Sequence, residues 1–528
     1  MARLVPLFVA LLAVCAVALA LVRLAGADGD VRTQNVVIGD TPATIYRAHA
    51  ATPLGKAPPV VVIAHGFAGS RTLMAPFATA LAKNGYVAVT FDFLGHGEHP
   101  RPLTGDVTAV EGATRALIEQ TAEVARYAGN LEGTGDGLAV LGHSMASDIV
   151  VRFAKAHPVD ATIAVSMFSP AVTAREPANL LVIVGAWEAG LAAEALRAVG
   201  LASAPQPAVA GVTYGDFALG TARRAAFSAQ SEHIAVLFNE ESLREAVMWL
   251  DKSFALERVG EVATSPRLEW IALLVVGLVA LGWPLSKLLP VLARPRTGAG
   301  LRWRALWPVI VVPMVATPLL LRVLPTDFLP VVVGDYLATH FLLYGLLTAL
   351  MLPLAGRLQR GPSAAAHRPA AQPTVEEAPG RASRMGLVLA TLAVALWSLG
   401  ALGLVVDTYV TNYQPVTARL PLLGALLAGT LAYFLATEWA SRGDGAARGG
   451  YMVAKLAFVI SLAIAVALDF ERLFFLIIIV PVIALYFVIY GLFSRWSYRR
   501  TGHPVPGAVG NAVVFGWAIT VTFPMLAG

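Results

Sequence analysis

The chain has 528 residues, enough for two or three domains. Hydrophobic residues make up 57% of it and charged residues only 14%, which excludes an ordinary soluble protein. The net charge of +5 does not indicate nucleic acid, because most arginines of the C-terminal half lie in short connections between apolar runs. The single cysteine, Cys15, excludes an internal disulfide and a cysteine-based metal site.

The chain opens with an apolar run from about Leu4 to Leu21, which follows Arg3 and ends near Arg23. Its length suits either a signal peptide or a signal anchor, and we assign residues 1–29 to this segment. Small residues after the run would permit cleavage, so both alternatives remain open. In either case the segment that follows is carried across the membrane.

Residues 30–259 have the pattern of a globular α/β domain. Short β-branched runs alternate with longer stretches whose apolar positions follow a helical period, which is typical of parallel βαβ units. The segment 34–46 is typical of an antiparallel hairpin at a sheet edge. We expect a mostly parallel sheet flanked by helices, with strands at residues 60–63, 87–91, 138–141, 162–165 and 180–184, and helices at 73–83, 108–127 and 241–250.

Residues 260–528 predict an all-α membrane domain of about eight transmembrane helices. Eight apolar runs follow one another, and each is about long enough to cross a bilayer. The connection at 356–384 is rich in Ala, Pro and Arg without an apolar period, which predicts a disordered cytoplasmic linker. The runs begin near Leu268, Leu306, Leu329, Met385, Leu420, Tyr451, Leu473 and Ala508.

Arginines are distributed unevenly over the connections between these apolar runs. The connections after the second, fourth, sixth and eighth spans are basic, whereas the opposite ones hold or adjoin only Arg322, Arg419 and Arg472. Because basic connections stay in the cytoplasm, this alternation predicts an integral protein, of a bacterial inner membrane, with residues 30–259 and the C-terminus outside the cytoplasm. The basic connections contain Arg294, Arg296, Arg302, Arg304, Arg357, Arg360, Arg368, Arg381, Arg384, Arg442, Arg448, Arg495, Arg499 and Arg500.

A serine with small neighbours follows one of the predicted strands. It stands in the sequence Gly142-His143-Ser144-Met145-Ala146 and opens an expected helix. This strand–turn–helix context is what a nucleophile elbow requires, and the residues two before and two after the serine must be small. Gly142 and Ala146 meet this requirement, although glycine is usual at the second position. Ser144 is therefore the candidate nucleophile.

A glycine-rich turn follows the strand predicted at residues 60–63. It runs from His65 and Gly66 to Ser70. Its backbone can present the N–H of Phe67 to the nucleophile, and the N–H of Met145 would supply a second donor. Two fixed donors aimed at a developing oxyanion are usually the largest catalytic contribution, with one donor worth about 3 kcal/mol. These residues are the candidate oxyanion hole.

The next predicted strand is followed by Asp92-Phe93-Leu94-Gly95-His96-Gly97. This sequence resembles the D-x-x-G-H-G turn of α/β-hydrolases. The order H-G-F, D-F-L-G-H-G and G-H-S-M-A is similar to that superfamily in motif and spacing, over roughly residues 36–255. The resemblance implies an α/β-hydrolase fold, in which an acid and then a histidine follow the nucleophile.

The resemblance places the acid at Glu188, three residues after a glycine at a strand end, where Asp is commoner. His233, just before the last predicted helix of the domain, is the candidate catalytic histidine. It would take the proton from Ser144, while Glu188 would orient the imidazole and stabilise its charged form. Asp216 or Glu232 could take the place of Glu188.

Other residues near this site are expected to have structural rather than catalytic roles. His65 and His96 are expected to bond loop backbone, and His143 to shape the pocket rather than transfer protons. The insertion 189–231 forms either part of an acyl pocket or an additional hairpin. The segment 166–179 is too short for the usual cap domain, which leaves an open site suited to a bulky substrate or one presented by a membrane.

The sequence predicts a membrane-anchored serine hydrolase that cleaves an ester, thioester or amide through an acyl-enzyme on Ser144. The expected partners are a small-molecule or lipid acyl substrate, drawn from lipid or cell-envelope material, and membrane lipid. A peptidase or an acyltransferase remains an alternative with the same residues. The sequence contains no metal-ligand cluster, phosphate loop or nucleotide fingerprint, so we expect no cofactor, no metal and no nucleic-acid partner.

A transporter or sensor, with the hydrolase domain as accessory module, is the alternative from another class. Eight further spans are more than an anchor needs, and Asp335 and His340 fall within one of them. If these two line a water-filled cavity, transport is favoured. If they face protein packing, the helices are a scaffold, with His340 bonding a neighbouring helix. Lys455 is expected to reach the inner membrane surface.

Overall fold

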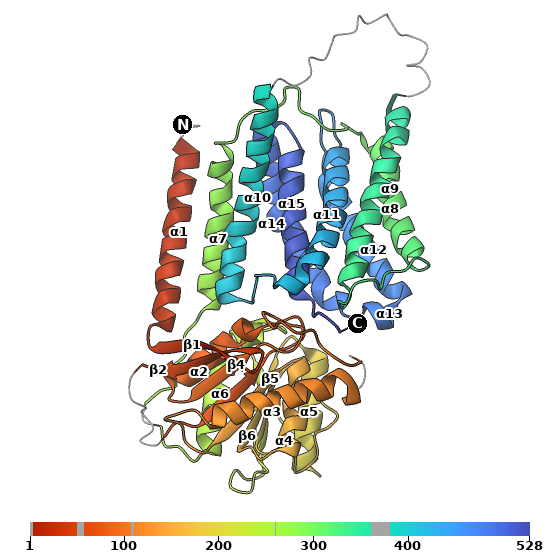
Figure 1. Ribbon diagram of the computed structural model, residues 1–528. Coiled ribbons are helices and arrows are strands. Elements are labelled where there is room, and N and C mark those ends of the chain that lie inside the picture. Colours follow the sequence, from red (N-terminus) through yellow and green to blue (C-terminus); the bar gives the residue numbers. More distant parts are fainter. Residues whose placement is uncertain (1–3, 50–56, 107–109, 259, 361–380, 528) are drawn as a thin grey trace, which may run out of the picture. The chain divides into compact units, whose positions relative to one another are not determined.

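The computed structural model describes residues 4–49, 57–106, 110–258, 260–360 and 381–527. The chain divides into two compact units, both visible in Figure 1. The first, called the helical unit, comprises Met1–Cys15, Val275–Leu404 and Thr417–Phe523. The second, called the sheet unit, comprises Ala16–Leu274, Val405–Val416 and Pro524–Gly528. The sheet unit thus includes three segments that the sequence assigns to the membrane domain, residues 260–274, 405–416 and 524–528.

Among the described residues, the sheet has nine strands in the order β1-β2-β4-β3-β5-β6-β7-β9-β8. The six strands from β4 to β9 along this order are parallel, while β1, β2 and β8 pair antiparallel at the two edges. A mostly parallel sheet was the prediction, and it is confirmed. The strands are β1 (Val31–Ile38), β2 (Thr41–Ala48), β3 (Val60–Ala64), β4 (Val87–Phe91), β5 (Leu138–His143), β6 (Ala161–Val165), β7 (Leu180–Gly185), β8 (Thr213–Tyr214) and β9 (Arg223–Ser228).

All five predicted buried strands and the edge hairpin are present, but β9 is not among the predicted strands. Its sequence, Arg-Arg-Ala-Ala-Phe-Ser, has no β-branched residue, so local preference does not indicate a strand. It is held by parallel pairing with β7 over its whole length. The insertion 189–231 therefore contributes a helix and the strand β9 that pairs with β7. It also contains the short β8–β9 hairpin, and a hairpin was one of the two forms predicted for it.

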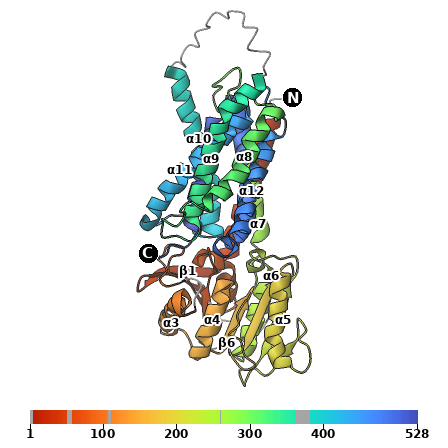
Figure 2. The same cartoon turned by 90° about the vertical axis from the view of Figure 1, so that its right-hand side faces the viewer.

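Helices cover both faces of this sheet. Helices α2 and α6 pack on one face, and α3, α4 and α5 pack on the other (Figures 1 and 2). On the second face, Val62 and Val140 of the strands meet Leu117 and Val150 of the helices in a fully buried core. The helices are α2 (Ala75–Lys83), α3 (Arg115–Gly129), α4 (Met145–Ala156), α5 (Ala189–Ser203) and α6 (Glu240–Ser253).

Nine helices among the described residues are long and apolar enough to cross a membrane, and each corresponds to one of the apolar runs of the sequence. Helix α9 continues through Arg360 and α10 begins at Arg381, so the predicted linker at 356–384 is shorter at both ends than expected. Its residues 361–380 lie outside the described residues. The nine helices are α1 (Leu4–Asp28), α7 (Leu268–Ser286), α8 (Trp303–Leu321), α9 (Gly334–Arg360), α10 (Arg381–Tyr409), α11 (Leu420–Ser441), α12 (Gly450–Leu468), α14 (Leu476–Thr501) and α15 (Val505–Thr522).

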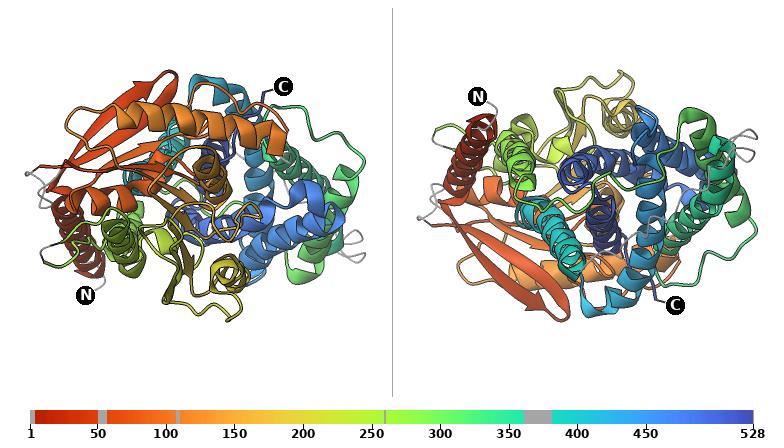
Figure 3. Two further views of the ribbon diagram at one scale, coloured as in Figure 1. Left: turned by 90° about the horizontal axis from the view of Figure 1, so that it is seen from below. Right: turned by 90° about the horizontal axis from the view of Figure 1, so that it is seen from above.

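The helical unit is held together by close packing of aromatic rings. Helix α11 packs against α9 and α15, and the helices run side by side in Figure 2 and in the end-on views of Figure 3. At the centre, Phe341 stacks on Phe458 at 4.5 Å between ring centroids, and Tyr433 lies 4.5 Å from Phe458. Such ring pairs add to the energy of area burial, by about 0.5–1.5 kcal/mol each.

Asp335 and His340 both face protein packing. The Asp335 carboxylate accepts the backbone N–H groups of Phe328 and Tyr336, at 2.9 and 2.8 Å, at the beginning of α9. His340 is fully buried, and its Nε2 lies 3.1 Å from Ser461 Oγ on the neighbouring helix α12. This is the arrangement that the sequence analysis linked to a scaffold.

Lys455 does not reach the membrane surface, and that prediction was wrong. Its side chain is only 5% exposed, and Nζ donates to Thr437 Oγ1 at 3.0 Å. The ammonium group lies over the rings of Tyr433 and Phe434, at 4.7 and 4.5 Å from their centroids. Ring faces attract a desolvated cation, which gives the charge a partner inside the bundle.

Candidate active site

Ser144 stands in a sharp turn between β5 and α4, in a backbone conformation that non-glycine residues rarely adopt. Its φ is 54° and its ψ is −117°. The turn is so tight that a Cβ on Gly142 would lie 2.3 Å from the carbonyl oxygen of Ala146. This contact explains why residue 142 must be glycine. Residues held in such strained conformations gather at functional sites, because the surrounding fold has to enforce them.

His233 lies within hydrogen-bond distance of the serine. Its Nε2 is 2.9 Å from Ser144 Oγ, and its Nδ1 is 2.6 Å from Glu188 Oε1. A proton on Nδ1 can be donated to the carboxylate, which leaves Nε2 as an acceptor for the serine hydroxyl. The imidazole is 30% exposed, whereas the Glu188 side chain is 6% exposed. The three residues therefore form one continuous hydrogen-bonded chain that opens to solvent at the histidine.

Glu188 follows β7 and is held by more than the histidine. Its Oε2 accepts the Ser166 hydroxyl at 2.7 Å and the Gly185 N–H at 2.9 Å. Burial opposes the negative charge, but the hydrogen bonds from His233, Ser166 and Gly185 outweigh it and lower the pKa of the carboxyl below its ordinary value. The carboxylate thus stays ionised beside His233 at neutral pH.

Ser166 is a site residue that the sequence analysis missed. It follows β6 directly, with a φ of 52°, at the same carboxyl edge of the sheet as the elbow. A polar residue at the end of a central parallel strand was the signal that could have drawn attention to it, since such ends meet at one edge.

The two alternative acids are engaged elsewhere. Asp216 accepts the backbone N–H groups of Ala218 and Leu219, at 2.7 and 3.1 Å, within its own turn. Glu232 accepts the N–H of Ala235 at 2.8 Å. Of the acids considered, Glu188 is the one that the structure brings to His233.

The glycine-rich turn passes directly beside Ser144. A Cβ on Gly66 would lie 2.9 Å from Ser144 Cβ and 3.0 Å from His143 Nδ1. The peptide that joins Gly66 to Phe67 therefore runs against the serine. Met145 is the first residue of α4, where backbone N–H groups have no acceptor within the helix. The two predicted oxyanion donors belong to segments that meet at Ser144.

The histidines near the site bond to backbone. His65 Nδ1 lies 2.8 Å from Gly66 O, and its Nε2 accepts the Phe93 N–H at 3.1 Å. His96 Nδ1 lies 2.9 Å from Leu94 O. His143 Nε2 lies 3.0 Å from the carbonyl oxygen of His233. Burial, reinforced by the positive charge that His233 can carry, lowers the pKa of His143 to about 3, so His143 is neutral and its Nε2–H supports the backbone of His233.

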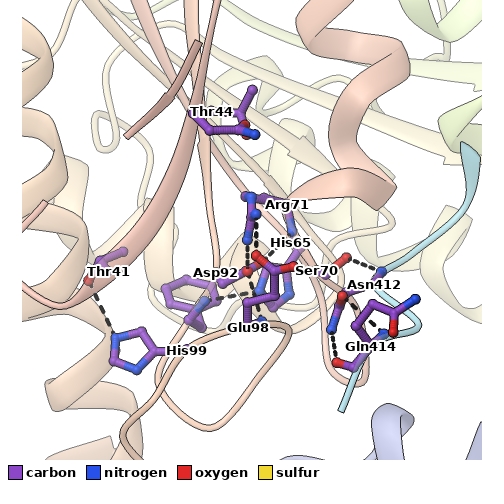
Figure 4. A network of polar contacts seen from close by, with 12 residues as sticks. Thr41, Thr44, His65, Ser70, Arg71, Asp92, Glu98, His99, Asn412 and Gln414 are labelled. Carbon is purple, nitrogen blue, oxygen red and sulfur yellow. Dashed lines mark hydrogen bonds and ion pairs between the residues drawn. The ribbon is translucent and has the colours of Figure 1, made fainter. Parts of the chain in front are cut away.

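Asp92 organises the turn that follows β4 (Figure 4). This fully buried carboxylate accepts the backbone N–H of Arg71 at 2.7 Å and that of Glu98 at 3.0 Å, and pairs with the Arg71 guanidinium. A Cβ on Gly97 would lie 2.4 Å from the Asp92 carboxyl carbon, so this turn requires glycine there. The D-x-x-G-H-G residues thus shape the loops around the site. Among the described residues, no group of three His, Cys, Asp or Glu is placed to hold a metal ion.

The sheet order, the strained serine after β5 and the helices on both faces define an α/β-hydrolase domain. Residues 55–232 match the family described as serine aminopeptidase, S33. The N-terminal half of the chain therefore has the α/β-hydrolase fold, and residues 55–232 are similar to this family. The match ends one residue before His233. No curated protein matches the chain in sequence.

Several solved structures are similar. A hypothetical protein from Pseudomonas aeruginosa is 11% identical, with 43% of this chain and 95% of that chain covered and a TM-score of 0.32. A Thermus thermophilus protein is 16% identical, with 42% and 98% covered and a TM-score of 0.29. A membrane phospholipase A, described as a bacterial virulence factor, is 14% identical, with 48% and 99% covered and a TM-score of 0.30.

Proposed function

We propose that the protein is a membrane-anchored serine hydrolase that cleaves an ester, thioester or amide through an acyl-enzyme on Ser144. The observation that carries this proposal is the chain of contacts from Ser144 Oγ to His233 Nε2, at 2.9 Å, and from His233 Nδ1 to Glu188, at 2.6 Å. Nucleophile, base and orienting acid lie in the order and at the distances that acyl transfer requires.

The proposed reaction proceeds in two halves. Ser144 Oγ attacks the substrate carbonyl while its proton passes to His233 Nε2, and Glu188 stabilises the resulting imidazolium. The N–H groups of Phe67 and Met145 bind the oxyanion. Its collapse breaks the bond to the leaving group, which takes the proton from His233. Water then attacks the acyl-enzyme with His233 again as base, releases the acid and restores Ser144.

Large apolar side chains stand exposed directly beside the site residues in sequence. Trp187, immediately before Glu188, is 69% exposed, and Phe168, two residues after Ser166, is 65% exposed. Ile234, immediately after His233, is 38% exposed. Exposed apolar groups around a polar centre favour an apolar ligand. They support a lipid or cell-envelope ester as substrate, and hence an esterase or lipase.

The peptidase alternative rests on a different observation, the description of the matching family as a serine aminopeptidase. The same residues would act on an amide, with an amine as leaving group. An acyltransferase would use the same acyl-enzyme with an alcohol or amine in place of water. Activity on aminoacyl p-nitroanilides rather than on p-nitrophenyl esters would favour the peptidase.

The membrane anchoring belongs to the proposal as well. Nine helices in the described part of the chain have the length and composition of membrane spans and support it, and the arginine pattern supports a hydrolase domain outside the cytoplasm of a bacterial cell. A transporter or sensor is less well supported, because the Asp335 carboxylate and His340 Nε2 make hydrogen bonds within protein packing.

The experiment that tests the proposal is labelling of membranes containing the full chain with a fluorophosphonate probe, which reacts with activated serines. Wild type should be labelled covalently, and Ser144→Ala should not. Ser253→Ala, on α6, is the matched control and should be labelled like wild type. If folded wild type resists the probe, or if Ser144→Ala is labelled equally, the proposal is wrong.

A further inference from the structure

The loop beside the nucleophile is tied to a segment that is remote in sequence. Ser70, at the end of the glycine-rich turn, is 1% exposed, and its Oγ lies 2.9 Å from Thr411 Oγ1. The backbone N–H of Asn412 donates to the same oxygen at 2.9 Å. Thr411 and Asn412 belong to the connection between α10 and α11, within the same compact unit. Figure 4 shows Asn412 beside Ser70.

Ser70 Oγ can form both hydrogen bonds at the same time. Because Ser70 Oγ accepts the Asn412 N–H, its own proton remains available for the Thr411 hydroxyl. A buried serine that donates one bond and accepts another is well satisfied, and both of its partners here come from residues more than 300 positions away in the chain. Without the connection, a buried hydroxyl would lose both partners.

The connection between α10 and α11 is itself held by internal hydrogen bonds. The N–H of Tyr413 donates to Asp407 Oδ1 at 2.7 Å, and Asn412 Nδ2 donates to the carbonyl oxygen of Gln414 at 2.9 Å. Asn412 and Tyr413 are 7% and 4% exposed. The segment therefore presents a fixed N–H and a fixed hydroxyl to Ser70 rather than a loose strand.

The loop that it holds is under conformational strain. Ala68 has a φ of 59°, a left-handed conformation that is unfavourable for a residue with a Cβ. The turn is closed by the Gly69 N–H donating to Gly66 O at 3.1 Å. Its first residue is fixed through His65, which accepts the Phe93 N–H. Ser70 is the corresponding fixed point at the other end of the turn.

We propose that the connection between α10 and α11 is a positioning element of the hydrolase site, which acts through Thr411 and the Asn412 N–H on Ser70. It thereby fixes the turn 65–70, to which the proposed oxyanion donor Phe67 belongs. This inference rests on the proposed function. Ser70 and Thr411 are positioning residues, since neither touches the reacting atoms. Oxyanion donors must be placed to a fraction of an ångström, so a loosened turn lowers the rate of the chemical step.

The kinetic test uses the full-length protein in detergent and a p-nitrophenyl ester. Ser70→Ala should lower kcat about 10-fold or more with KM changed less than 2-fold, because the lost contact serves the transition state. Thr411→Val should lower kcat by a smaller factor, and Thr411→Ser, which keeps the hydroxyl, should restore it. Thr417→Val, at an exposed threonine farther along the same connection, is the control and should match wild type.

The effects should also be coupled. The kcat of the Ser70→Ala/Thr411→Val double variant should be close to that of Ser70→Ala alone, because both changes break one link. Factors that multiply would mean that the two residues act independently, and would overturn the proposal.

Hydrogen–deuterium exchange gives a readout that does not depend on activity. Amide exchange in peptides spanning residues 65–70 should speed up several-fold in Thr411→Val, while peptides from β5 and α4 should exchange as in wild type. Unchanged exchange at residues 65–70 together with unchanged kcat would overturn the inference. If wild type shows no hydrolase activity, the proposed function fails while the exchange result still decides whether the connection fixes the turn.

Discussion

The Ser166 hydroxyl donates to Glu188 Oε2 at 2.7 Å, on the carboxylate oxygen that does not contact His233. The two oxygens of Glu188 thus have separate tasks. Oε1 receives the histidine, and Oε2 is held in place by Ser166 and by the Gly185 N–H at 2.9 Å. A glutamate is one methylene longer than the more usual aspartate, and these two additional bonds limit the freedom that the extra torsion would give it.

Removing this support should affect the rate more than the stability of the fold. Glu188→Gln should lower kcat/KM by about 10³- to 10⁴-fold, because a neutral amide neither stabilises the imidazolium nor enforces its tautomer. Ser166→Ala should cost about 10-fold, as expected for one hydrogen bond to a charged group. Steady-state kinetics with a p-nitrophenyl ester checks both. If Ser166→Ala equalled wild type, Oε2 would not need that bond.

The contact between the turn and the nucleophile predicts the effect of a single methyl group. In Gly66→Ala the new Cβ would lie 2.9 Å from Ser144 Cβ, so either the turn or the elbow must move. The fluorophosphonate labelling rate should fall by about 100-fold or more, the usual cost of a lost oxyanion donor. Gly190→Ala is the matched control. Nothing lies within 4 Å of its new Cβ, so labelling should be unchanged and Tm equal or slightly higher.

Much of the hydrolase domain could be predicted because its determinants are local. The buried strands are β-branched runs, and the elbow is recognisable because a strained turn restricts residues 142 and 146 to small side chains. Glu188 and His233 follow from the order of elements in the fold. Their distances could not be read from the sequence, since they depend on how strand ends meet at one sheet edge.

Other features are long-range and left no local pattern. Strand β9 is Arg- and Ala-rich and is fixed by its pairing with β7. The partners of Ser70 come from a connection between two apolar helices. Lys455 was expected at the membrane surface because a lysine near a helix end usually extends outward, yet ring faces and Thr437 accommodate it inside. In each case, tertiary contacts override what the local sequence favours.

The buried His143 predicts acid sensitivity. Its pKa is lowered to about 3, first by burial and then by the charge of His233, whereas in an unfolded chain it is about 6.5. Between these values the unfolded state binds one more proton than the folded state, so the stability contributed by neutral His143 is present above pH 6.5 and falls as the pH drops toward 3. The slope is about 1.4 kcal/mol per pH unit.

In His143→Gln the unfolded chain no longer has the imidazole that binds this additional proton. The glutamine amide can still donate to the carbonyl oxygen of His233. Tm measured from pH 7 to pH 4 should therefore fall less steeply in His143→Gln than in wild type. His157→Gln, at an exposed histidine on the same domain, should fall as steeply as wild type. Parallel curves for wild type and His143→Gln would contradict the prediction.

The arginine pattern predicts on which side of the membrane the hydrolase domain lies, and the chain's single cysteine makes the test simple. In a Cys15→Ser background, Glu132→Cys introduces an exposed thiol in the hydrolase domain, and Arg296→Cys introduces one in the basic connection after α7. In spheroplasts, a membrane-impermeant maleimide should label Glu132→Cys directly and Arg296→Cys only after permeabilisation. The reverse pattern would place the proposed site in the cytoplasm. It would then exclude cell-envelope material as substrate, because a catalytic serine on the cytoplasmic side meets only lipids of the inner leaflet and soluble esters.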